Sequence, residues 1–131
     1  MNSRTEKRIH KFLKDRGWDQ LRPADLAKSV MIEGGELLEL FQWENLSLED
    51  IKKDKEKLAE IKKELADVLI YALDIAVLLG FDTEKIVFEK LALAEKKYPA
   101  RLMKKNATAG AGSGRDPLYW KIKKTYRRKG K

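Results

Sequence analysis

The sequence contains no cysteine and a single histidine, His10. The absence of cysteine excludes disulfide bonds, thiolate zinc sites and a cysteine nucleophile. One histidine leaves little room for a histidine-rich metal centre or a histidine-dependent catalytic triad. The longest apolar run, residues 68–81, is interrupted by Asp74 and is too short to cross a bilayer. Because the charged N-terminal residues also lack a secretory signal pattern, we expect a soluble, cytoplasmic protein.

Charged residues make up 38% of the 131 residues, but the two signs are distributed unevenly. Residues 1–100 contain 18 Lys and Arg against 20 Asp and Glu, a net charge of −2. Residues 101–131 contain 11 Lys and Arg against one acid, a net charge of +10. The basic character therefore belongs to the C-terminal part of the chain. The net charge of the first hundred residues gives no reason to expect a nucleic-acid-binding domain there.

The spacing of apolar residues predicts helices throughout the first hundred residues. Pro23 is typical of the first turn of a helix, and Ser47 followed by Asp50 resembles a capping box. Alternation typical of β-strands is scarce. We therefore predict an all-α fold, a four-helix bundle with short connections. Its helices are expected at about residues 4–16, 23–43, 47–79 and 82–99, with 65–79 buried at the centre because that stretch is apolar on nearly all sides.

The C-terminal part of the chain is predicted to be a separate extension. Residues 106–114 have the composition of a flexible linker, and Asp116-Pro117 favours the start of a short helix that contains Tyr119 and Trp120. We predict a domain over residues 1–105, and a flexible linker with a basic, aromatic-containing tail over residues 106–131. Two interpretations of the tail stay open: it contacts polyanions, or it docks onto the domain or a neighbouring subunit.

Four carboxylates lie on faces that should meet the core. Glu33 falls inside the apolar arc of the second predicted helix, and Glu36 lies at its edge. Glu64 and Asp67 lie among the apolar residues of the third predicted helix. Each pair is spaced i, i+3, so both carboxylates of a pair point to the same side. Asp74, one heptad beyond Asp67, is expected on that side too, either as a supporting group or as a polar interruption of a helix contact.

Burying these acids requires a compensating charge, because unpaired buried carboxylates cost several kcal/mol each, to order of magnitude. No Lys or Arg occurs between Ser29 and Trp43, and none between Glu64 and Leu79. A divalent cation would satisfy the four carboxylates. Because all the ligands are hard oxygens, the sequence favours Mg²⁺, with Mn²⁺ as a substitute, over Zn²⁺. The alternative is a partly solvated groove in which surface lysines pair with the acids.

Together these motifs resemble the MazG-like all-α nucleoside triphosphate pyrophosphohydrolases, in the branch that includes dCTP pyrophosphatases. The family signature is E-x-x-E followed, after a gap, by E-x-x-D. This chain has Glu33-Gly-Gly-Glu36 and Glu64-Leu-Ala-Asp67, with 27 residues between them. Phe-Gln-Trp43 and Lys97-Tyr98-Pro99 match further elements of that branch. The resemblance covers roughly residues 5–100.

The resemblance implies hydrolysis of a nucleoside triphosphate between its α- and β-phosphates, in a role that cleans the nucleotide pool. Glu33, Glu36, Glu64 and Asp67 would hold the metal, and Glu36 is the candidate general base. Two groups of residues would bind the substrate: Trp18 and Trp43 at the base, and Lys90, Lys97 and Tyr98 at the phosphates.

Other functions remain open at this point. A phosphoribosyl-ATP pyrophosphohydrolase is the alternative within the same superfamily, and the Phe-Gln-Trp and Lys-Tyr-Pro elements disfavour it. A nucleic-acid or nucleoprotein binding module, acting through the basic tail, is the alternative from a different class. A domain of about 100 residues in four helices leaves apolar surface, and the family is typically oligomeric. We therefore expect a homodimer or a tetramer with sites near the subunit contacts.

Overall fold

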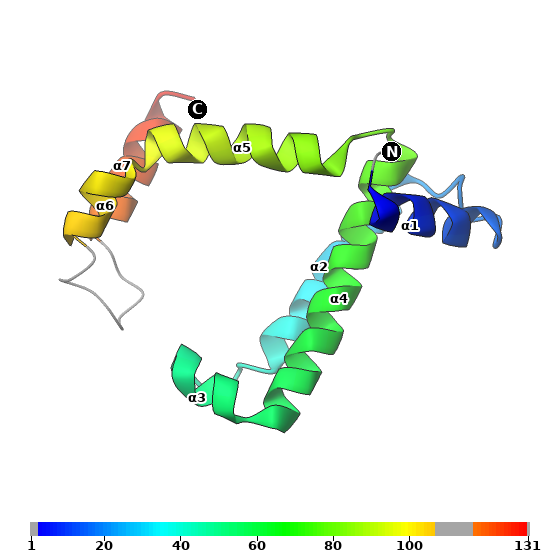
Figure 1. Ribbon diagram of the computed structural model, residues 1–131, viewed down its shortest axis with the longest axis horizontal. Helices are drawn as coiled ribbons and strands as arrows, with labels where there is room; N and C mark the ends of the chain where they lie inside the picture. Colours follow the sequence, from blue (N-terminus) through cyan, green and yellow to red (C-terminus); the bar gives the residue numbers. More distant parts are fainter. Residues whose placement is uncertain (1–2, 107–116, 131) are drawn as a thin grey trace. The chain divides into compact units, whose positions relative to one another are not determined.

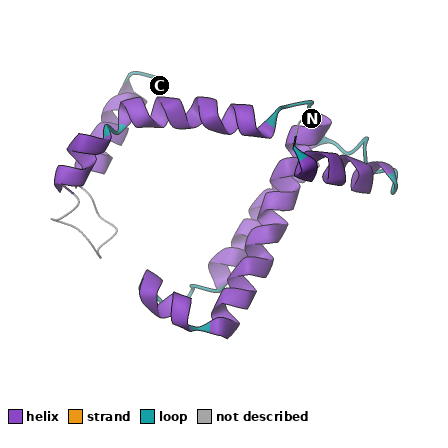
Figure 2. Cartoon of the chain, viewed as in Figure 1, coloured by secondary structure: helices purple, strands orange, loops and turns teal. Residues whose placement is uncertain are grey.

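The computed structural model describes residues 3–106 and 117–130. Within these ranges the chain forms helices joined by short loops, and no strand occurs (Figures 1 and 2). The predicted all-α class is confirmed, although the described residues form six helices before residue 107, where four were expected, and one after it, as expected. Their bounds are α1 (Arg4–Lys14), α2 (Pro23–Glu39), α3 (Leu48–Lys53), α4 (Lys55–Leu78), α5 (Thr83–Lys97), α6 (Ala100–Asn106) and α7 (Pro117–Arg128).

Two predicted helices differ from the structure for local reasons. The helix expected over 47–79 is interrupted at Asp54, whose backbone is extended and whose side chain accepts a hydrogen bond from the Lys57 N–H. Asp54 therefore caps α4 and ends α3, because a capping side chain offers the backbone an alternative to a continuous helix. The second helix ends at Glu39 instead of Trp43. There the hydrogen bonding changes to the tighter i to i−3 pattern, because the Phe41 N–H donates to the Leu38 carbonyl.

The C-terminal helices also differ from the prediction in part. After Pro99 the chain starts a further helix, α6, which the sequence reading did not anticipate. Its first turn is closed by the Met103 N–H, which donates to the Pro99 carbonyl at 3.0 Å. The short helix expected after Asp116-Pro117 is present as α7. The predicted linker lies outside the described residues except for Asn106, which ends α6.

The structure divides into two compact units, residues 1–84 and 85–131. In the first unit α2 and α4 lie side by side (Figure 1), and α1 also packs on α4. The small core consists of Ile9, Leu13 and Val77, with Leu73 and Leu78 packed against it. In the described part of the chain, no helix combines the length and apolarity that a bilayer span requires.

The prediction that residues 65–79 are buried at the centre is wrong for the single chain. On α4 only Asp74, Ala76 and Val77 are buried. Leu65 and Leu69 are 43% and 51% exposed. The physical reason is that α1 and α2, which pack on α4, cover only part of an all-round apolar helix.

A buried carboxylate joins the start of α1 to the start of α5. Glu6 is 1% exposed and forms a capping box with Ser3. Its Oε2 accepts a hydrogen bond from the Ser3 N–H at 3.1 Å, and its Oε1 accepts one from the Thr83 N–H at 2.7 Å. The second bond connects residues 77 positions apart, so this carboxylate ties the first turn of α1 to the point where α5 begins.

Replacing this carboxylate should destabilise the protein. Because Glu6→Ala removes a charged acceptor from two backbone donors, we expect the free energy of unfolding to fall by about 2–3 kcal/mol. Ser3→Ala, which removes only the local cap, should cost about 1 kcal/mol. Urea denaturation of the two variants measures both values. Equal losses would contradict a role for the bond to Thr83.

Candidate active site

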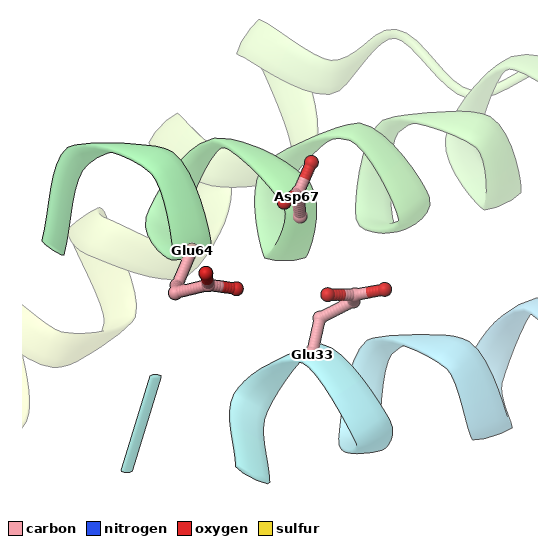
Figure 3. A group of neighbouring side chains, drawn as sticks. All are labelled: Glu33, Glu64 and Asp67. Carbon is pink, nitrogen blue, oxygen red and sulfur yellow. The ribbon is translucent and has the colours of Figure 1, made fainter. Parts of the chain in front are cut away.

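Three carboxylates from two helices face one another in the first unit. Glu33 extends from α2, and Glu64 and Asp67 extend from the adjacent part of α4 (Figure 3). One oxygen from each lies within 4.8 Å of the others, and all three side chains are partly buried. The i, i+3 spacing on α4 places its two acids on one face, and the pairing of α2 with α4 brings Glu33 opposite them.

Of the two carboxylate oxygens of Glu64, one has a cationic partner and the other has none. Its side chain is 12% exposed, and its Oε1 lies 2.7 Å from the Nζ of Lys63. The sequence reading missed this cation because it considered only the residues after Glu64. Lys63 is itself 71% exposed, so the pair contributes little. The other oxygen of Glu64, Oε2, is buried and has no hydrogen-bond partner among the described residues.

Glu36 lies close to the three carboxylates without belonging to the tightest group. The negative charge of Glu33 raises the pKa of Glu36, and desolvation and Glu64 raise it further. The four acids singled out from the sequence are therefore near one another, but three of them converge and Glu36 stands at the edge.

The donor set fits a hard divalent cation. It consists of carboxylate oxygens only, one of which is buried without a partner. A cation would relieve both the mutual repulsion and the unsatisfied oxygen. Oxygen-only donors suit Mg²⁺ and Mn²⁺.

A pocket of about 450 Å³ adjoins these acids. Asp67 lines it together with Trp18, Tyr71 and Asp74. The ring of Trp18 stands edge-on to Phe12, with centroids 5.9 Å apart and an interplanar angle of 68°. The structure thus brings Trp18, predicted to contact a base, beside a predicted metal ligand. An aromatic-lined hollow next to a carboxylate cluster can bind a flat ring, and a charged group attached to that ring can extend toward a cation held by the carboxylates.

Trp43 is not brought to the same place within the chain. Because α2 ends at Glu39, Trp43 lies in the following loop, where it is 88% exposed. It lines a different hollow, with Phe41 and Ile51. The sequence reading put it on the helix because the apolar pattern continues past residue 39.

Lys90, Lys97 and Tyr98 lie together in the second unit. They line a cavity of about 610 Å³, to which α7 contributes Tyr126. The Nζ of Lys97 lies 5.4 Å from the Tyr98 ring centroid and 4.9 Å from that of Tyr126. The three predicted phosphate-binding residues are therefore neighbours, and α7 supplies a wall that sequence reasoning did not assign.

Helix α7 packs on this cavity through aromatic rings. Tyr119 stacks on Tyr98 with centroids 5.1 Å apart and planes 20° from parallel. The Nζ of Lys123 donates to the Tyr119 hydroxyl at 3.2 Å. Hydrogen bonding from Lys123 lowers the pKa of Tyr119. The interleaving of tyrosines with lysines in α7 was the only signal of this contact in the sequence.

These features define a class of protein: an all-α chain whose carboxylate pairs face one another from adjacent helices. The chain belongs to the MazG-like family, whose model matches residues 28–110. It is 33% identical over 105 residues to dCTP pyrophosphatase 1 of Rattus norvegicus and 32% identical over 112 residues to that of Homo sapiens. Each match covers 77% of this chain and 61% of the relative, so the chain spans less than two thirds of these relatives.

A solved structure is similar over most of its length. It is a pyrophosphatase from Archaeoglobus fulgidus DSM 4304, with a TM-score of 0.62 and 36% sequence identity. The match covers 71% of this chain and 87% of that one. The helical arrangement therefore agrees with that of a pyrophosphatase.

Mg²⁺ should stabilise the fold through the carboxylates. At 100 times its dissociation constant, a ligand of the folded state adds about 2.7 kcal/mol, which raises the melting temperature. Glu64→Gln should abolish this response and leave the metal-free protein as stable or more stable, because it removes one of the repelling charges. Thermal denaturation with and without Mg²⁺ measures both effects.

Glu60→Gln is the matched control, since Glu60 is exposed one turn earlier on α4. It should keep the full response to Mg²⁺. A Glu64→Gln protein that melts far lower without metal would show instead that Glu64 serves structural pairing.

Proposed function

We propose that the chain hydrolyses a nucleoside or deoxynucleoside triphosphate to the monophosphate and pyrophosphate, with Mg²⁺ or Mn²⁺ as the cofactor. The observation that carries this proposal is the convergence of Glu33, Glu64 and Asp67 beside a pocket lined by Trp18. The names of the similar proteins, dCTP pyrophosphatase and pyrophosphatase, support it. Removal of damaged or surplus nucleotides from a cytoplasmic pool is the role that fits this reaction.

The four acids would have two roles, cation binding and proton acceptance. Glu33, Glu64 and Asp67 converge closely enough to hold a cation together, with Glu36 as a fourth ligand or a neighbour. When bound, such a cation neutralises phosphate charge and lowers the pKa of a water molecule. The water oxygen would form a bond to the α-phosphorus while the bond from that phosphorus to the oxygen bridging it to the β-phosphate breaks. Pyrophosphate would then leave with the bridging oxygen. Glu36, which lies outside the group of three, is the carboxylate best placed to accept the proton.

The aromatic and basic residues would bind the remainder of the substrate. Trp18 would contact the base in the pocket beside Asp67. Lys90, Lys97 and Tyr98, which share one cavity, offer cations and a hydroxyl to phosphate oxygens. Trp43 would complete a base site only with help from another subunit, because in the single chain it is almost fully exposed.

We propose a homodimer or tetramer as the working form. Leu65 and Leu69 on α4, with Met31 and Leu38 on α2, are apolar and exposed on the two helices that carry the carboxylates. Several large apolar side chains exposed on paired helices are typical of a subunit interface. Sedimentation velocity on the full chain should give the mass of two or four copies.

Tail-mediated binding of polyanions is the second candidate. On α7 the basic residues Lys121, Lys124 and Arg128 are exposed, as is Trp120. Cations next to an exposed aromatic ring suit a phosphate backbone with stacking bases. This activity is compatible with hydrolysis by the first unit.

Glu36→Gln tests the proposed reaction. We expect kcat for pyrophosphate release to fall by about 10²–10⁴-fold, because the amide cannot accept the proton. Stabilisation by Mg²⁺ should remain, since Glu33, Glu64 and Asp67 are unchanged. A screen of NTPs and dNTPs that scores pyrophosphate provides the assay. Wild-type activity that persists in EDTA would refute the carboxylate mechanism.

Truncation after residue 106 separates the tail from the reaction. Binding to polyanions should be lost, and in the full chain that binding should weaken steeply with salt. Because Tyr98 loses its stacking partner Tyr119, KM for the free nucleotide should rise while kcat stays nearly unchanged. Steady-state kinetics and sedimentation of the truncated chain measure these effects. A large loss of kcat would show that α7 is needed for the chemistry.

A further inference from the structure

Asp74 is a buried acid that the proposed reaction does not use. It lies on α4, two helical turns beyond Asp67, and is 4% exposed. Burial raises the pKa of its carboxyl group. Its Oδ1 has no hydrogen-bond partner among the described residues. A native protein rarely keeps such an atom without a reason, so Asp74 calls for a partner that the isolated chain does not supply.

The surroundings of Asp74 indicate where that partner would come from. Asp74 lines the pocket that also contains Trp18, Tyr71 and Asp67. No Lys, Arg or His is among the residues that line this pocket. The acid therefore faces an aromatic hollow that offers it no cation. A ligand that enters the hollow is the group positioned to satisfy the carboxyl oxygens.

The spacing along α4 matches the length of a nucleoside. Asp67 belongs both to the carboxylate group and to the pocket. Seven residues of helix separate Asp67 from Asp74, a rise of roughly 10 Å. A nucleotide whose phosphates lie at the carboxylates extends through its sugar to its base over a comparable length. The outer edge of the base would then lie near Asp74.

We propose that Asp74 determines base specificity: its carboxyl accepts a hydrogen bond from an exocyclic amino group, so that amino-bearing bases such as cytosine are favoured over uracil. The inference rests on the proposed function. In its ionised form the carboxylate of Asp74 only accepts hydrogen bonds. Cytosine carries an amino group at position 4, where uracil carries a carbonyl oxygen. Against the carboxylate, uracil would place one acceptor opposite another, which is how a polar site rejects an analogue.

The test compares dCTP with dUTP, whose bases differ at position 4 and in the proton that uracil carries on N3. The wild type should show a kcat/KM for dCTP at least 10-fold above that for dUTP. Asp74→Leu should reduce this preference at least 10-fold, through KM for dCTP and with kcat within about 3-fold. Asp74→Asn offers a donor as well as an acceptor, so it should also lower the preference, by raising kcat/KM for dUTP.

Asp15→Leu is the control, since Asp15 is an exposed aspartate at the end of α1, and it should leave the preference unchanged. No preference in the wild type, or an equal loss for both substrates in Asp74→Leu, would overturn the role of Asp74. If neither nucleotide is hydrolysed, the proposed function fails on its own. Calorimetric titration with dCMP and dUMP then decides about Asp74, because tighter binding of dCMP that Asp74→Leu abolishes supports the inference and equal binding overturns it.

Discussion

The carboxylates on α2 and α4 repel one another, and the first unit must hold them close together in spite of that repulsion. Glu33 on one helix and Glu64 and Asp67 on the other are held with oxygens within 4.8 Å. The only compensation among the described ion pairs is the exposed Lys63. Such an arrangement costs free energy in the absence of a cation. That cost is offset elsewhere, by the caps at Ser3, Ser47 and Asp54 and by the packing of α1 on α4.

What could be predicted from the sequence follows from how local each feature is. The pairing of Glu33 with Glu36, and of Glu64 with Asp67, depends only on helical periodicity, which a single sequence shows. The break at Asp54 and the end of α2 depend on competition between capping and helix propensity, which the apolar pattern does not report. Trp43 was misplaced for that reason. The bond from Thr83 to Glu6 connects distant residues, and no local pattern indicates it.

A pattern of apolar residues also indicates that a helix is buried, but it does not say whether the same chain or a second copy covers that helix. The stretch 65–79 reads as a central helix, yet Leu69 is half exposed in the single chain. The pattern and the structure agree if a second copy covers this surface, because an all-round apolar helix is stable only when most of its faces are covered. The proposed second copy would also cover Trp43, which is large, aromatic and almost fully exposed. Both observations point to the same place, the surfaces of α2 and α4 and the loop that follows α2.

The two units differ in local charge. The first unit gathers carboxylates on facing helices. In the second, Lys123 and Arg127 of α7 place positive charge near Tyr98, beside Lys97. A divalent cation suits the carboxylates of the first unit, and phosphate groups suit the basic residues of the second. The boundary of charge near residue 100 in the sequence falls inside the second unit, which spans residues 85–131. Because α7 stacks on Tyr98, its charge acts on the residues expected to meet the phosphates.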